Sequence, residues 1–227
     1  MRKRILLLFL VLAVSVAVSG VQAQQRVPKT AIVNSEHDLR STFNAASFTL
    51  CTFCHVAHKP GDAPEGPGPL LWNHTLSSVT SYGVYSSESF DALNTDITDL
   101  GGQMTVSNLC LSCHDGTVAV NSFYEPILGA NFQPIPEGTT FMPDSARIRD
   151  LTKSHPVNFT YDSALANAAA LRVPASTSSV DGNGLVPLFG GKMQCATCHD
   201  PHNGNSGIFA RPFPAQTSGT FCTYCHI

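Results

Sequence analysis

The chain has 227 residues and a formal net charge of −3. This length corresponds to one large domain or two small ones. The sequence contains no basic patch of the kind that indicates a nucleic-acid partner. It also contains no basic amphipathic helix of the kind that binds a membrane surface.

The first residues have the pattern of a secretory signal. Residues 2–4 are basic, residues 5–20 are an apolar run, and a short cleavage-site pattern precedes Gln24. The pattern predicts a signal peptide over residues 1–23 and a mature chain over residues 24–227. A retained membrane anchor is the alternative, but so short a run is below the usual length of a membrane span. The mature chain is expected to be exported, without a membrane span, and its ten Lys and Arg against sixteen Asp and Glu give a net charge of −6.

All eight cysteines fall in one repeated pattern, C-x-x-C-H. It occurs at residues 51–55, 110–114, 195–199 and 222–226, here called motifs one to four. The pattern is the attachment signature of c-type haem, because two thiols at this spacing reach both vinyl groups on one haem edge and the next histidine binds the iron. The sequence therefore predicts four covalent haem c groups, held by Cys51, Cys54, Cys110, Cys113, Cys195, Cys198, Cys222 and Cys225, with proximal ligands His55, His114, His199 and His226.

Three other uses of paired cysteines fit the sequence less well. Cys₄ zinc sites leave the histidine after every pair unexplained. A redox-active dithiol needs one C-x-x-C near a βαβ pattern rather than four scattered copies. A disulfide framework does not require one spacing, or a histidine after each pair.

Five more histidines are available as distal ligands. We predict that four of them bind iron, namely His37, His58, His155 and His202. His74 follows the only tryptophan of the chain, where capping or packing also explains a polar side chain, and it is the reserve ligand. Met104, Met142 and Met193 are alternatives that would raise the potential. Pro156 biases His155 toward an extended backbone that would aim its ring from a rigid loop.

His58 and His202 each lie three residues after a proximal histidine. Three extended residues span about 10 Å, too little to pass around the porphyrin edge to the opposite face of the same iron. Each of these histidines, as a ligand, would therefore bind a different haem from the one beside it in the sequence. Such a histidine makes two haems near neighbours.

Regular structure is predicted to be sparse. The chain has 17 Gly and 15 Pro, many of them in short runs that interrupt helices and strands. Short helical turns are expected at the four motifs, a longer helix over residues 161–173, and a small β-hairpin turning at Gly190–Gly191. The predicted fold class is mostly irregular, with short α-helices and this hairpin, wrapped around a chain of four haems whose apolar surfaces replace an ordinary core.

The combination of motifs resembles the doubled-motif multihaem cytochromes c. The features that carry the resemblance are CTFCHVAH followed by LLWNH, then CLSCHDGT, KSHPV, and the predicted hairpin before CATCHDPH. In size and haem count the chain is similar to the small tetrahaem outer-surface cytochromes of the OmcE type, which polymerise into extracellular haem filaments. This resemblance implies that His58 is donated to the haem of motif four in a neighbouring subunit. From the residues alone, His58 could equally bind the haem of motif two within one monomer.

The expected function is electron transfer rather than enzymatic catalysis, because a histidine on both sides blocks every iron. The leading hypothesis is a subunit of an extracellular conductive filament that passes electrons to external acceptors or other redox proteins. A monomeric periplasmic electron shuttle is the alternative. A multihaem reductase, the third possibility, would need one iron without a distal ligand.

Overall fold

The computed structural model describes residues 32–56, 71–92, 105–148, 150–203 and 221–227, and most of this chain is irregular. The predicted signal peptide lies outside the described residues. The helices and strands are η2 (Ser47–Thr49), α2 (Val106–His114), η4 (Asp144–Ala146), β1 (Phe159–Thr160), α3 (Ser163–Ala168), β2 (Lys192–Met193) and α4 (Cys195–Cys198). The prediction of a mostly irregular chain with short helices is confirmed, and the strands form a two-stranded antiparallel sheet where a small β-hairpin was predicted.

The helix predicted over residues 161–173 is only half as long as expected. α3 begins at Ser163 and is capped by Asp162, whose side chain accepts a hydrogen bond from the Leu165 N–H at 2.9 Å, as an N-cap should. It ends at Ala168, and Ala170 has a positive φ of 51°. The chain turns here although its alanines favour helix, since Leu171 forms an antiparallel bridge with His226. Backbone contacts with motif four thus end the helix early.

The two-stranded sheet joins segments that are far apart in the sequence. β1 and β2 are antiparallel, with Phe159 opposite Met193 and Thr160 opposite Lys192. The predicted turn at Gly190–Gly191 is present, with φ of 62° and 78°, and it is closed by mutual backbone hydrogen bonds between Phe189 and Lys192. Two consecutive positive φ values suit glycine and give the twist of a tight hairpin. The turn was predicted correctly, but β2 forms its sheet with β1 rather than with the segment just before the turn.

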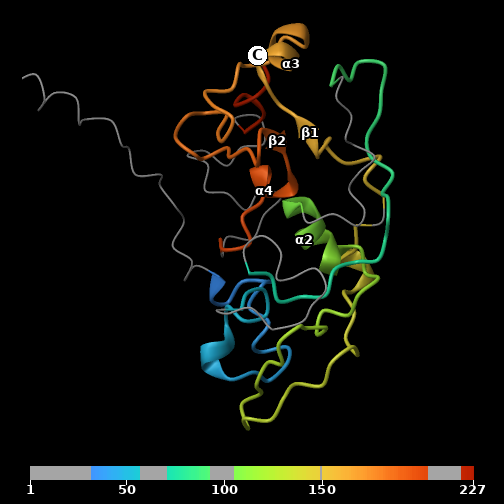
Figure 1. The fold of residues 1–227 in the computed structure, drawn as a ribbon, viewed down its shortest axis with the longest axis vertical. Coiled ribbons are helices and arrows are strands. Elements are labelled where there is room, and N and C mark those ends of the chain that lie inside the picture. Colours follow the sequence, from blue (N-terminus) through green and yellow to red (C-terminus); the bar gives the residue numbers. More distant parts are fainter. Residues whose placement is uncertain (1–31, 57–70, 93–104, 149, 204–220) are drawn as a thin grey trace, which may run out of the picture.

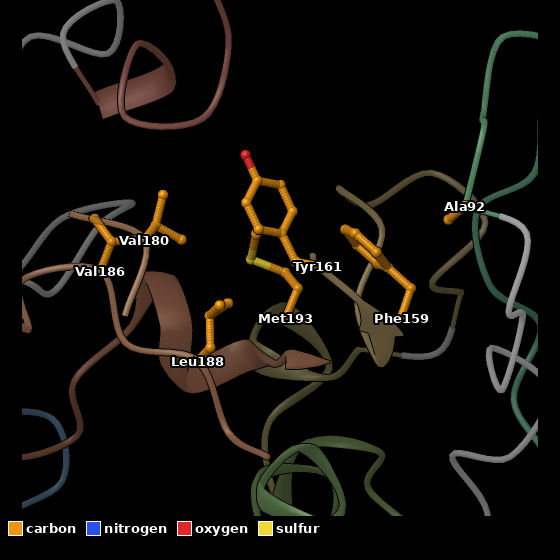
Figure 2. Close-up of a cluster of buried hydrophobic side chains, with 7 residues drawn as sticks. All are labelled: Ala92, Phe159, Tyr161, Val180, Val186, Leu188 and Met193. Carbon is orange, nitrogen blue, oxygen red and sulfur yellow. The ribbon is translucent and has the colours of Figure 1, made fainter. Parts of the chain in front are cut away.

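Among the residues that the structure describes, buried hydrophobic side chains form three small clusters rather than one core. The largest contains Phe159, Tyr161, Val180, Val186, Leu188, Met193 and Ala92. Tyr161 and Met193 lie at its centre, between Phe159 and the side chains of Val180, Val186 and Leu188 (Figure 2). The second cluster contains Phe53, Phe123, Ile127 and Ile135, and the third contains Leu111 and Leu151.

Each cluster includes or touches a different C-x-x-C-H motif. Cys225 of motif four packs against the first cluster, Phe53 of motif one belongs to the second, and Leu111 of motif two belongs to the third. The apolar contacts of the chain are therefore divided among the predicted haem attachment points.

Buried asparagines hold the loops together between these clusters. The Asn73 side chain donates to the carbonyl of Thr52 at 2.7 Å and accepts from the Glu125 N–H at 2.8 Å. The Asn121 side chain accepts from the N–H groups of Thr139 and Thr140. An amide can donate and accept at once, so one asparagine satisfies backbone groups that a helix or sheet would otherwise pair.

The motifs follow the long axis of the molecule. In Figure 1 residues 32–56, coloured blue, lie in the lower half. The helices α2 and α4 lie side by side near the middle. Residues 221–227, which include the C-terminal residue, lie in the upper part. In the described part of the chain, no helix has the length and apolar character needed to cross a membrane.

The burial of the largest cluster can be tested by replacing valine with alanine at one buried site and at one exposed site. Val186 is fully buried and Val173 is 53% exposed. We expect Val186→Ala to lower the free energy of unfolding by about 2 kcal/mol, because it removes buried methyl groups and leaves a cavity. Val173→Ala, the matched control, should change it by less than about 0.5 kcal/mol. Urea denaturation of the haem-loaded protein measures both, and equal losses would contradict the assignment of the core.

Candidate haem-binding site

The C-x-x-C-H motifs share one backbone conformation, a single helical turn. In motifs one, three and four, the N–H of the histidine donates to the carbonyl of the first cysteine, at 2.9 Å, 3.0 Å and 2.8 Å. Motif two lies inside α2, which Thr105 caps by accepting from the Asn108 N–H. A helical turn puts both cysteines and the histidine of a motif on neighbouring positions of one face. This arrangement suits attachment to one edge of a planar group.

Motifs two and three are held against each other by a buried polar network. The Ser107 hydroxyl in α2 donates to the side-chain carbonyl of Gln194, the N-cap residue of α4. Gln194 in turn donates to Asn158 at 2.8 Å, and the Cys195 N–H donates to the Ser107 hydroxyl at 3.0 Å. The network fixes the ends of α2 and α4 relative to each other.

The thiols of motifs two and three also touch. Cys110 and Cys195 form a hydrogen bond, which raises the pKa of Cys110 and lowers that of Cys195. Two groups attached through these sulfur atoms would therefore lie edge to edge. Elsewhere, burial raises the pKa of Cys54 to about 11 and that of Cys113 to about 12.

In the described residues the cysteines form neither a disulfide framework nor a site for a bare metal ion. All eight lie in the described part of the chain, and none forms a disulfide. Within the ranges described above, no three His, Cys, Asp or Glu side chains converge as ligands of a bare metal ion.

Three of the proximal histidines face a second histidine from a distant part of the chain. The ring centres are 6.2 Å apart for His37 and His114, 6.2 Å for His55 and His202, and 6.5 Å for His155 and His226. The ring planes are nearly parallel, at 10°, in the pair of His55 and His202. In each pair one ring follows a C-x-x-C and the other is a predicted distal ligand.

These distances can be compared with the geometry of an axially coordinated iron. An imidazole nitrogen binds a metal at about 2 Å, so two rings on opposite sides of one metal have centres about 6 Å apart. All three pairs have this separation. The spacing of the ring centres is therefore compatible with a haem iron between the two rings of each pair.

The second ring nitrogen of several of these histidines is hydrogen-bonded, as is usual for metal ligands. Nδ1 of His114 donates to the Ala146 carbonyl at 3.0 Å, and Nδ1 of His155 donates to the Pro156 carbonyl at 2.9 Å. Nδ1 of His202 donates to Asp200 at 3.2 Å. Each bond uses Nδ1 as the donor and leaves Nε2 as the nitrogen with a lone pair for a metal.

His74, the reserve ligand, has a different environment. Its side chain is almost completely buried, and its two ring nitrogens lie 2.8 Å and 2.9 Å from the carbonyls of Thr75 and Ala119. Burial lowers its pKa. Both nitrogens are thus engaged with the backbone, and His74 links the segment around residue 74 to the loop after α2.

The remaining candidates are placed as follows. Met193 belongs to the largest hydrophobic cluster, and His199 contributes, with His114 and His202, to the electrostatic surroundings of His37. The carbonyl of Met142 accepts from the Arg147 side chain. His58 and Met104 lie outside the described residues.

Two features beside the motifs were not predicted from the sequence. Arg172 holds motif four, since its N–H donates to the Cys225 carbonyl at 2.7 Å and its Nε to the Thr223 carbonyl at 2.6 Å. Trp72 packs edge-on against His55 with ring centres 6.1 Å apart. Its indole N–H is buried and has no hydrogen-bond partner among the described residues, so it is available to an acceptor such as a haem propionate. The sequence shows that Trp72 lies two residues before His74, but it does not show that Trp72 packs against His55.

Comparison with known proteins agrees with a haem site. A family described as "Doubled CXXCH motif" matches residues 187–227, which contain motifs three and four. No curated protein matches the chain. The family match supports a multihaem c-type cytochrome, which binds haem c covalently and transfers electrons.

The network between α2 and α4 gives a stability prediction. Ser107→Ala should lower the free energy of unfolding by about 1–3 kcal/mol, because it leaves the Cys195 N–H without its buried partner and removes one hydrogen bond to the Gln194 side chain. Ser112→Ala is the matched control, since Ser112 is equally buried in α2 but donates to the Leu109 carbonyl of its own helix. Thermal or urea unfolding of the two variants measures the difference. A larger loss for Ser112→Ala would contradict the proposed link between the helices.

Proposed function

We propose that this protein is an electron carrier with four covalently bound haem c groups, each iron held between two histidines. The observation that carries the proposal is the set of three histidine pairs, His37 with His114, His55 with His202, and His155 with His226. Each pair joins a motif histidine to a distant loop at the distance an iron requires.

The roles of the side chains follow from their positions. The eight motif cysteines would form the thioether links, and His55, His114, His199 and His226 would be the proximal ligands. His202, His37 and His155 would be the distal ligands for motifs one, two and four. When bound, each haem iron supplies one-electron chemistry between its ferric and ferrous states.

The contribution of the protein is to hold the histidines and restrict access to the metal. Hydrogen bonds from Nδ1 fix the orientation of three rings, and the hydrophobic clusters lie beside three of the motifs. An iron with a histidine on each side has no free position for a substrate. We therefore propose electron transfer without enzymatic catalysis.

His58 is proposed as a ligand donated between subunits. The two irons that the sequence suggested for it, those of motifs two and four, have His37 and His155 of the same chain opposite the proximal ring. His58 would then serve the iron of motif three, the fourth of the proposed haems. A ligand shared between subunits therefore remains the proposal. The haem that receives it differs from the haem of motif four, which the resemblance implied.

We further propose that the chain is exported and assembles end to end outside the cell. Support comes from the signal-like N-terminus, the resemblance to filament-forming cytochromes, and the row of motifs along the long axis (Figure 1). A row with one motif toward each end lets electrons enter at one end and leave at the other, and a second copy would extend it. A monomeric periplasmic shuttle is the alternative.

Loss of one distal histidine should change one iron only. We expect His155→Ala to keep the same number of haems, by pyridine haemochrome assay and mass, while one haem becomes high-spin in the absorption spectrum. His155 is exposed, so its truncation should leave the fold intact, and His74→Gln serves as a control that should leave every haem low-spin. Four low-spin haems in His155→Ala would refute this ligand assignment.

Assembly can be tested by electron microscopy of the secreted, haem-loaded protein. Wild-type protein should form filaments, and His58→Ala should form monomers or short oligomers with unchanged haem content, because a ligand between subunits is lost. Lys59→Ala, at the next residue, should still form filaments. Wild-type material that contains only monomers would favour the shuttle.

A further inference from the structure

Asp200 occupies an unusual position between two predicted haem sites. It directly follows His199, the proximal histidine of motif three, and it precedes His202 by two residues. One carboxylate oxygen, Oδ1, accepts from the backbone N–H of His202 at 3.0 Å and from Nδ1 of the same ring at 3.2 Å. The Asp200 side chain is only 14% exposed.

These two bonds fix the ring of His202. An oxygen that accepts from both the backbone and the ring of one residue restricts the rotation of that ring, and Pro201 restricts the backbone between them. The ring is held nearly parallel to that of His55, at 6.2 Å. Asp200 thus directly follows motif three in sequence but contacts the histidine whose ring lies beside that of His55 in motif one.

The acceptor of this bond differs from those of His114 and His155. Nδ1 of His114 and Nδ1 of His155 donate to backbone carbonyls, which are neutral. An ionised acceptor attracts the Nδ1 proton more strongly, which raises the basicity of the opposite ring nitrogen. A more basic ligand stabilises the ferric state relative to the ferrous state.

We propose that Asp200 is a positioning residue that lowers the reduction potential of the haem held by motif one, through His202. The proposal rests on the proposed function, because it requires His202 to bind that iron. Reduction adds one electron to the iron and breaks no bond, and the Nδ1 proton stays on His202. Asp200 makes the haem of motif one harder to reduce than a neutral acceptor would, so this haem passes its electron on more readily.

The test is a redox titration of the haem-loaded Asp200→Asn variant with dithionite, followed by the absorption of the reduced haems. Asparagine keeps an acceptor oxygen and removes the charge. One haem should become easier to reduce by roughly tenfold in its equilibrium constant, the size typical of ligand-orienting partners, which is about 59 mV for one electron. Haem content and low-spin spectra should not change. Asp91→Asn, the matched control at an exposed carboxylate, should leave all potentials as they are.

A second variant distinguishes failure of this inference from failure of the function. In His202→Ala one haem should become high-spin, and it must be the haem whose potential moves in Asp200→Asn. Unchanged potentials in Asp200→Asn, or a shift in another haem, would overturn the role of Asp200 and leave the electron carrier intact. Four low-spin haems in His202→Ala would overturn the ligand assignment itself.

Discussion

Two histidine rings can bind one iron from opposite sides only if their centres lie about 6 Å apart, and this requirement connects segments of the chain that share little else. His37 and His114 are far apart in sequence, as are His55 and His202, and each pair includes a histidine from an irregular loop. Each pair would close a long loop of the chain through a metal. A covalent and coordinate link of this kind restricts the unfolded chain, as any cross-link does.

The small hydrophobic clusters are consistent with such a construction. A chain of this size usually buries one continuous core, whereas here the apolar side chains divide into groups beside motifs one, two and four. Buried asparagines replace regular hydrogen bonding between the loops. Local packing then determines the position of each motif, and the proposed irons join the local units. In this description the segments of motifs two and three contact each other directly, through α2 and α4.

The sequence predicted the motifs, the sparse secondary structure and the glycine turn, because each depends on neighbouring residues. C-x-x-C-H can be recognised within five residues, and Gly190–Gly191 allows positive φ values that few other residues adopt. The argument that three residues cannot pass around a porphyrin directs His202 away from its own motif, and in the structure its ring lies 6.2 Å from that of His55. Sequence could not predict which distant histidines face each other, because the pairing depends on the path of irregular loops.

Other features were hidden for the same physical reason. The alanine-rich segment 163–170 has the composition of a longer helix, but contacts between Leu171 and His226 end it early. Asp200 looks like a simple turn residue in the sequence. The hydrogen bond between Asp200 and His202 bears on the predicted haem of motif one only because the His202 ring lies beside that of His55. Roles that pass from one segment to another need three-dimensional placement.

The most direct test of the account is an experimental structure of the haem-loaded protein that identifies both axial ligands of each iron. The account predicts one iron between His37 and His114, one between His55 and His202, and one between His155 and His226. A structure in which the two rings of any of these pairs bind different irons, or bind none, would contradict it.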